Sequence, residues 1–372
     1  MKVDLIIGSR QEFIKLAPVA RIMRNYPGVD PRIILTDQHT DLLNGLPEFF
    51  SLEIHTILKV MAEGQSLAVF TSKLLLALEK QFQEDKPDVV LVQGGTTSAF
   101  IGALAAYYNG IPVCHAEAGL RPNDLYSPFP EEVNRAAIEQ IAQLYFAPTE
   151  RALQTLQLEG KTATHLVGNT VIDAALFAQM RHRLQAAALP VKLDKFKKLV
   201  LVTLHRKESP DSGLGHICAA IQTLHNTRPE LEFLLPTHSN LVVKEVISNA
   251  LADLERVHLT PPLSYPQMIT AMDQAWLLMT DSEGLQEEAS AFHLPILVLR
   301  EKSEHIEAVE SGSAVLCGAS TEKLVEEVER LLTDAEAYKA ISLATNPSSD
   351  GKAAMRITEI IKHTFKPLAS KL

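Results

Sequence analysis

Apolar residues in this chain gather in short runs, and longer stretches of helical periodicity separate these runs. The first run, residues 3–7, is continuous and rich in β-branched residues, which is typical of a strand buried on both faces. The stretch at 67–82 has the long apolar face of a helix. The runs that predict strands are residues 3–7, 32–36, 88–92, 111–114, 144–147, 165–167, 199–203, 231–235, 257–259, 276–279, 296–299 and 314–316. Their alternation with helices predicts an α/β fold with parallel, doubly wound sheets.

The alternation is interrupted at 186–198, where the pattern dissolves into a lysine-rich segment. Because 372 residues are too many for one ordinary core, we predict that this segment links two Rossmann-like domains, 1–185 and 199–350. The last stretch, 351–372, is expected to form a helix that packs back on the N-terminal domain. Polar residues end several strands in both domains. This predicts a GT-B-like architecture, in which two parallel-sheet domains face a cleft.

The composition narrows the class of protein. Apolar residues make up 46% and charged residues 22%, and no apolar run reaches the ~18 residues of a membrane span. The first residues read as a strand and not as a signal peptide. The formal net charge of −10 argues against general nucleic-acid binding. Three widely spaced cysteines indicate buried packing and a cytoplasmic protein, with neither a disulfide framework nor a zinc site.

Two stretches are candidates for ligand chemistry. The strand at 111–114 opens at His115 into a polar loop that carries Glu117, Glu131 and Arg135, and strand ends of α/β sheets are where ligands bind. A solvated loop can be equally polar, so both interpretations stay open. The glycine turn after the first strand leads into a helix with Arg10 and Lys15, which is typical of an anion site and also of a plain turn.

Several segments together resemble the non-hydrolysing UDP-N-acetylglucosamine 2-epimerase family. The polar loop, HAEAGLRPNDLYSPFPEEVNR, resembles the family's HxEAGLR…SPxPEExNR segment. The other segments that resemble the family, in the expected order, are GSRQEFIKLAPV at 8–19, GNTVID at 168–173, HRKES at 205–209, DSEGLQEE at 281–288 and NPSSDGKA at 346–353. The resemblance implies inversion at C2 of a UDP-HexNAc sugar through elimination and re-addition of UDP, with no metal or other cofactor. It also implies a homodimer.

The resemblance assigns roles to residues of this chain. It implies that Glu117 and Glu131 are the acid/base carboxylates and that His205 lies at the diphosphate or the leaving oxygen. The residues that it places at the UDP-sugar, the expected substrate, are Arg10, Lys15, Gln38, His39, Arg135, His238, Ser282, Gly284, Glu288 and His305.

Three positions depart from the family's pattern. Gly95 stands where the family has an aspartate counted among its catalytic acids, and loss of an acid/base group typically costs about 10²–10⁴ in rate. Glu283 replaces a glycine at the phosphate turn, where a carboxylate facing phosphate at ~5 Å would be repelled by about 3 kcal/mol per charge. His305 replaces a phosphate-facing arginine. The hypotheses that stay open are an active epimerase, an enzyme for another UDP-sugar, one that hydrolyses it, and a catalytically weak binding or partner subunit.

Overall fold

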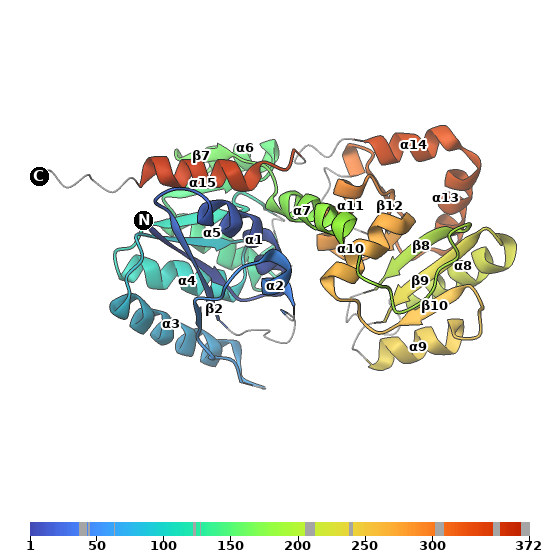
Figure 1. Cartoon of the computed structure of the whole chain (residues 1–372), viewed down its shortest axis with the longest axis horizontal. Helices are drawn as coiled ribbons and strands as arrows, with labels where there is room; N and C mark the ends of the chain where they lie inside the picture. Colours follow the sequence, from blue (N-terminus) through green and yellow to red (C-terminus); the bar gives the residue numbers. More distant parts are fainter. Residues whose placement is uncertain are drawn as a thin grey trace, which may run out of the picture. The chain divides into compact units, whose positions relative to one another are not determined.

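The computed structural model describes residues 1–36, 43, 45–62, 64–121, 124–126, 128–204, 213–237, 241–301, 309–344 and 350–365, and it leaves the side chains of 241 and 242 undescribed. The chain forms two compact units (Figure 1). The first unit consists of Met1–Ala174 and Asp350–Leu372, and the second of Ala175–Ser349. Each unit is built on one parallel sheet.

The sheet of the first unit has the strand order β3-β2-β1-β4-β5-β6-β7 among the described residues. Its strands are β1 (Lys2–Ile7), β2 (Asp30–Leu35), β3 (Thr56–Ile57), β4 (Val89–Gln93), β5 (Val113–Ala116), β6 (Leu144–Ala147) and β7 (Thr164–Leu166). Its helices are α1 (Arg10–Arg24), α2 (Leu46–Phe50), α3 (Leu67–Glu84), α4 (Thr97–Tyr108), α5 (Glu131–Ile141), α6 (Glu150–Leu158), the start of α7 (Thr170–Leu184) and α15 (Ala353–Thr364). Every strand is paired in parallel, since each crossover runs through a helix or a long connection.

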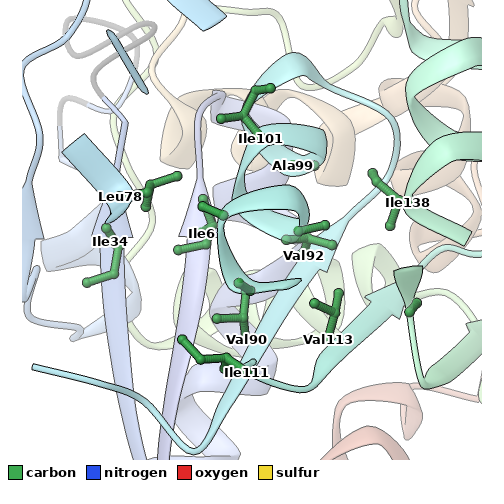
Figure 2. Packing of buried hydrophobic residues seen from close by; sticks show 14 of the residues in the cluster. Ile6, Ile34, Leu78, Val90, Val92, Ala99, Ile101, Ile111, Val113 and Ile138 are labelled. Carbon is green, nitrogen blue, oxygen red and sulfur yellow. The ribbon is translucent and has the colours of Figure 1, made fainter. Parts of the chain in front are cut away.

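The inner strands β1, β4, β5 and β6 of this sheet are buried on both faces, which explains their continuous apolar runs. Ile6, Val90 and Val92 lie in one apolar cluster with residues of α3, α4 and α5 (Figure 2). Their sequence neighbours Leu5 and Leu91 point to the opposite face and are also buried. Helices α1 and α15 pack against each other in the same unit. Covering both faces is what a doubly wound sheet requires.

The sheet of the second unit has the strand order β10-β9-β8-β11-β12-β13 among the described residues. Its strands are β8 (Lys198–Thr203), β9 (Leu231–Pro236), β10 (Val257–Thr260), β11 (Ala275–Thr280), β12 (Ile296–Val298) and β13 (Ala314–Leu316). The helical segments are α8 (Leu214–Thr227), α9 (Leu241–Leu251), α10 (Tyr265–Gln274), α11 (Glu283–Ala289), η2 (Ser290–Phe292), α13 (Thr321–Thr333) and α14 (Ala335–Leu343). All strand pairs are again parallel.

All twelve runs that predict strands are strands of these two sheets, so the doubly wound prediction is confirmed. The pattern missed β3, because two residues at a sheet edge carry no measurable alternation. The chain leaves the first unit within α7 and returns to it at Asp350. The segment 186–198 follows α7, and its role as a linker stays a prediction.

The cysteines are packing residues, as the sequence predicts. Cys114, Cys218 and Cys317 are all buried and free. Burial raises the pKa of Cys218 to about 11 and that of Cys317 to about 12, so these thiols stay protonated at neutral pH. In the described part of the chain, none of the helices combines the length and the apolar character that crossing a membrane would need.

Candidate functional site

The polar loop of the first unit begins at the end of β5, where two side chains take different environments. His115 is fully buried, its Nε2 lies 2.8 Å from the carbonyl oxygen of Gly94, and burial lowers its pKa, so the imidazole is neutral. Glu117 follows at φ 61°, a left-handed conformation that a glutamate rarely adopts. Such backbone outliers cost of order 1–3 kcal/mol and cluster at functional sites. This one suggests that the direction of the Glu117 side chain matters.

The Glu117 carboxylate is held by a cation and an amide. Its Oε2 lies 2.6 Å from Nζ of Lys15, and Nε2 of Gln93 donates to the same oxygen. The side chains of Lys15 and Glu117 are only 9% and 15% exposed, so water screens this ion pair weakly. Lys15 comes from α1, Gln93 from the end of β4 and Glu117 from the end of β5, so three elements fix one carboxylate.

A buried carboxylate joins the turns after β1 and β4. The Glu12 side chain accepts hydrogen bonds from the backbone N–H of Gly8 at 2.8 Å and of Ser9 at 2.6 Å, and from the hydroxyl of Thr96 at 2.6 Å. Burial raises the pKa of Glu12, and these donors oppose that effect. The arrangement fixes the start of α1, which carries the half-buried Arg10 and the buried Lys15, at the carboxyl edge of the sheet.

The second carboxylate of the loop, Glu131, begins α5. An acidic residue is favourable in a first helical turn because it complements the helix dipole. Glu131 is half-buried, and its Oε2 is buried without a hydrogen-bond partner among the described residues. Such an oxygen is an unused acceptor, or a donor when protonated. In the next turn of α5 Arg135 is buried, with Nη1 lying 3.4 Å from Glu132.

The first turn of α5 lies directly against the turn that follows β4. Nδ2 of Asn134 donates to the carbonyl oxygen of Gly95 at 3.0 Å. A Cβ built on Gly95 would collide with the carbonyl oxygen of Glu131, and it would lie 3.3 Å from Cβ of Arg135. The position where the family's aspartate is missing therefore has no space for a side chain.

A buried charge network supports the base of the loop. Glu139 is fully buried and accepts from the backbone N–H of Gly119 at 2.7 Å, and Arg121 forms ion pairs with Glu139 and with Glu159. Nδ1 of His115 lies 3.5 Å from Glu139. This network therefore ties the end of β5 and the residues 119 and 121 to α5.

A small hollow opens beside Glu117. It is lined by Glu117, the segment 167–170 and Ile357, among others. The lining brings the end of β5 together with the GNTVID segment. The space that a water molecule can enter measures only ≈ 10 Å³, about the room for one water molecule, so this hollow alone does not hold a ligand.

In the second unit, three of the predicted nucleotide contacts lie at the turn between β11 and α11. The backbone N–H of Ser282 donates to Oγ1 of Thr280 at 2.9 Å. Gly284 is half-buried in the first turn of α11, and Glu288 is buried near its end. The Glu283 carboxylate forms an ion pair with the guanidinium of Arg300.

The remaining predicted residues, Gln38, His39, His205, His238 and His305, lie outside the described residues. Within the part of the chain that the structure describes, no group of three or more His, Cys, Asp or Glu side chains could hold a metal ion. Sequence reasoning missed Gln93 and Glu12. Each is a polar residue at a strand end or in a first helical turn, and that position is the signal that could have found them.

The chain matches a family model described as UDP-N-acetylglucosamine 2-epimerase over residues 21–362. It is 40% identical over 371 residues to the UDP-N-acetylglucosamine 2-epimerase of Escherichia coli strain K12, and the alignment covers 98% of this chain and 99% of that protein. Among solved structures it is similar to UDP-GlcNAc 2-epimerase from Neisseria meningitidis bound to UDP-GlcNAc, with a TM-score of 0.91, 34% identity and coverage of 98% and 100%.

A second solved structure, the S. aureus MnaA–UDP co-structure, has a TM-score of 0.87 and 36% identity to this chain, with coverage of 98% and 96%. These likenesses extend over both sheets. They confirm the GT-B-like fold class expected from the sequence.

Proposed function

This chain belongs to the UDP-N-acetylglucosamine 2-epimerase family, and we propose that it interconverts UDP-GlcNAc and UDP-ManNAc. The observation that carries the proposal is the 40% identity to the E. coli epimerase over almost the whole of both chains. The two carboxyl groups at the ends of β5 and in α5 support it, because C2 inversion needs groups that remove and return a proton. The activity is an isomerisation of a sugar nucleotide.

The reaction proceeds by elimination and re-addition. A base takes the proton from C2, the C1–O bond breaks with its electron pair going to UDP, and a C1–C2 double bond forms. UDP then adds back to C1, and the proton returns to C2 on the opposite face. The atoms balance without an oxidant, since the sugar intermediate differs from the substrate only by the elements of UDP and one proton.

The first unit supplies the proton-transfer groups in this proposal. Glu117, ion-paired with Lys15 and bonded to Gln93, is a fixed carboxylate that accepts a proton on one face of the sugar. Glu131, whose buried Oε2 has no hydrogen-bond partner among the described residues, exchanges a proton on the other face. Arg10 and Arg135 provide positive charge for the diphosphate. His205 stays a proposed partner of the leaving oxygen.

The second unit binds the nucleotide in this proposal. Ser282, Gly284 and Glu288 lie in one turn and the short helix after it, which suits contacts to phosphate and ribose. The contacts of Gln38, His39, His238 and His305 stay predictions from the family resemblance. The Glu283–Arg300 ion pair supports phosphate binding nearby, because it turns the added carboxylate toward a cation.

The test is exchange at C2. The protein is incubated with UDP-GlcNAc in deuterated water, and we expect UDP-ManNAc and deuterium at C2 of both sugars. Glu117→Gln serves as the inactive control, and Glu326→Gln, which removes an exposed carboxylate of α13 in the second unit, serves as the matched active one. The absence of both the epimer and deuterium at C2 would overturn the proposal. Release of UDP without the epimer would favour the glycal-forming or hydrolytic alternative instead.

We further propose a homodimer formed through the α3–α4 side of the first unit. These two helices pack side by side and expose large apolar side chains. The exposed residues are Leu67, Val69 and Leu76 of α3 and Tyr107 and Tyr108 of α4. Exposed apolar surface of this kind marks association sites. Leu76→Lys should convert a dimer into a monomer in sedimentation, whereas a monomeric wild type would contradict the proposal. A cytoplasmic location stays a prediction.

A further inference from the structure

Gly95 is a glycine for reasons of packing and not of backbone conformation. The preceding residue, Gly94, has φ 67°, where a side chain is strained, whereas Gly95 has no such left-handed value. A left-handed conformation therefore does not require glycine at position 95. What excludes a side chain is the first turn of α5, because an added Cβ would meet the carbonyl group of Glu131, lying 3.1 Å from its carbon and closer still to its oxygen.

The contact between Gly95 and α5 is the local anchor of that helix. Pro130, which precedes α5, gives it no side-chain cap. The buried side chain of Asn134 instead donates to the carbonyl oxygen of Gly95 at 3.0 Å. Since Glu131 is the first residue of α5, the depth at which this helix seats on the β4–α4 turn fixes where its carboxyl group lies.

We propose that Gly95 is a positioning residue for Glu131, and that restoring the family's aspartate at this position lowers the activity. The predicted loss of activity rests on the proposed function. A side chain at position 95 can be accommodated in two ways, by moving α5 together with Glu131 or by moving the β4–α4 turn together with Gln93, a donor to Glu117. Either movement displaces a proton-transfer carboxylate, and a displacement of about 1 Å can cost about 10²-fold in rate.

The experiment compares four glycine substitutions in the full chain. Gly95→Ala and Gly95→Asp insert the side chain at α5. Gly102→Ala is the control for packing stress alone, because the three atoms nearest to its Cβ would all belong to Ile6 of β1, at 3.0–3.1 Å. Gly215→Ala is the neutral control, because its Cβ would meet nothing within 4 Å. Backbone hydrogen exchange of residues 131–141 is measured without ligand, and kcat and KM are measured with UDP-GlcNAc.

We expect both Gly95 variants to exchange at least about 10-fold faster in α5 and to lose about 10²-fold in kcat, with KM within about threefold of the wild type. The two controls should keep wild-type exchange in α5 and wild-type kcat. The proposal is overturned if Gly95→Asp has wild-type or higher kcat, or if α5 exchange is unchanged in both Gly95 variants. A kcat loss in Gly102→Ala as large as that in Gly95→Ala would also overturn it.

The two proposals fail separately. If the wild type turns over no UDP-GlcNAc, the proposed function is wrong, and the exchange of α5 alone decides whether Gly95 seats this helix. If the wild type is active and Gly95→Asp gains activity, the proposed function stands and the positioning role is wrong.

Discussion

The β4–α4 turn and the β11–α11 turn make an instructive pair, because each connects a buried parallel strand to a helix and each departs from the pattern that the family resemblance implies. At Gly95 the first turn lacks a carboxylate, and at Glu283 the second carries an additional one. The structure accommodates the two changes differently. A helix backbone fills the space at Gly95, whereas the Glu283 side chain turns toward Arg300.

This difference shows which kinds of change a site tolerates. The Glu283 carboxylate is neutralised by one cation, Arg300. At Gly95 the backbone of α5 occupies the space of a side chain, so a side chain added there must move this helix or the turn. The second kind of change is therefore harder to reverse by a single substitution.

The largest contrast should come from removing a carboxylate beside each turn. Glu131→Gln removes a proposed proton-transfer group, so we expect kcat to fall by about 10²–10⁴-fold. Glu283→Gln breaks an ion pair that touches no proposed reacting atom, so its kcat should stay within about threefold. Steady-state kinetics with UDP-GlcNAc measure both variants. Equal losses would show that the two turns do not differ in function.

Removing one cation from each region should change the free energy of unfolding by different amounts. Lys15→Met leaves the Glu117 carboxylate buried without its ammonium partner, and such losses cost about 3–5 kcal/mol in the free energy of unfolding. Arg300→Met exposes a carboxylate that is already partly solvated, so we expect about 1 kcal/mol or less. Urea unfolding measures both, and the double variant Lys15→Met/Glu117→Gln should recover most of the first loss. No recovery would mean that the charge pairing is not the cause.

A third carboxylate extends the comparison, because its partners are backbone N–H groups and not a cation or a packed helix. Asp173 of α7 accepts from the N–H of Ala354 at 3.0 Å, and burial, with a smaller effect of Asp350, raises its pKa to about 6. Between pH 4 and 6 the folded chain keeps this proton while the unfolded chain, with an ordinary pKa of 3.8, releases it. The free energy of unfolding should therefore fall as the pH rises through this window, by about 2–3 kcal/mol, and stay lower above pH 6.

Asp173→Asn tests this dependence, since an amide keeps the accepting oxygen and does not ionise. The difference in unfolding free energy between this variant and the wild type, measured at pH 4.5, 5.5 and 7, should change in favour of the variant as the pH rises. A difference that stays constant across these pH values would show that Asp173 does not carry the effect.

The smallest effect is expected from restoring glycine at position 283. Because Arg300 already neutralises the Glu283 carboxylate, Glu283→Gly should change the dissociation constant of UDP by less than about threefold. Titration calorimetry with UDP measures it. A gain near 100-fold would agree with the ~3 kcal/mol repulsion of a carboxylate that faces phosphate, and would contradict the neutralisation.

The sequence predicted the fold well because the signal of a buried parallel strand is local. Runs such as 144–147 and 199–203 fall within β6 and β8, since burial on both faces makes nearly every position apolar. The two-residue strand β3 and the helix α14 were missed. The first is too short for any pattern, and the second adjoins α13 without a glycine or proline between them.

The candidate site could be located from sequence only in part. The family pattern pointed to Glu117 and Glu131, and both lie at the carboxyl edge of the first sheet. Which groups meet them could not be read locally, because Lys15 and Glu117 are 102 positions apart. Likewise, the sequence shows only that position 95 has no acidic side chain. The packing of α5 shows that a side chain there would collide with the backbone of this helix.

The return of the chain to its first unit has a consequence for how the molecule matures on the ribosome. Helix α15, which packs on α1 and supplies the amides for Asp173, is the last described helix to be synthesised. The second unit is continuous in sequence and can close while α1 still lacks this neighbour. We therefore expect nascent chains stalled before residue 350 to protect the second sheet from proteases and to leave the first one open to them.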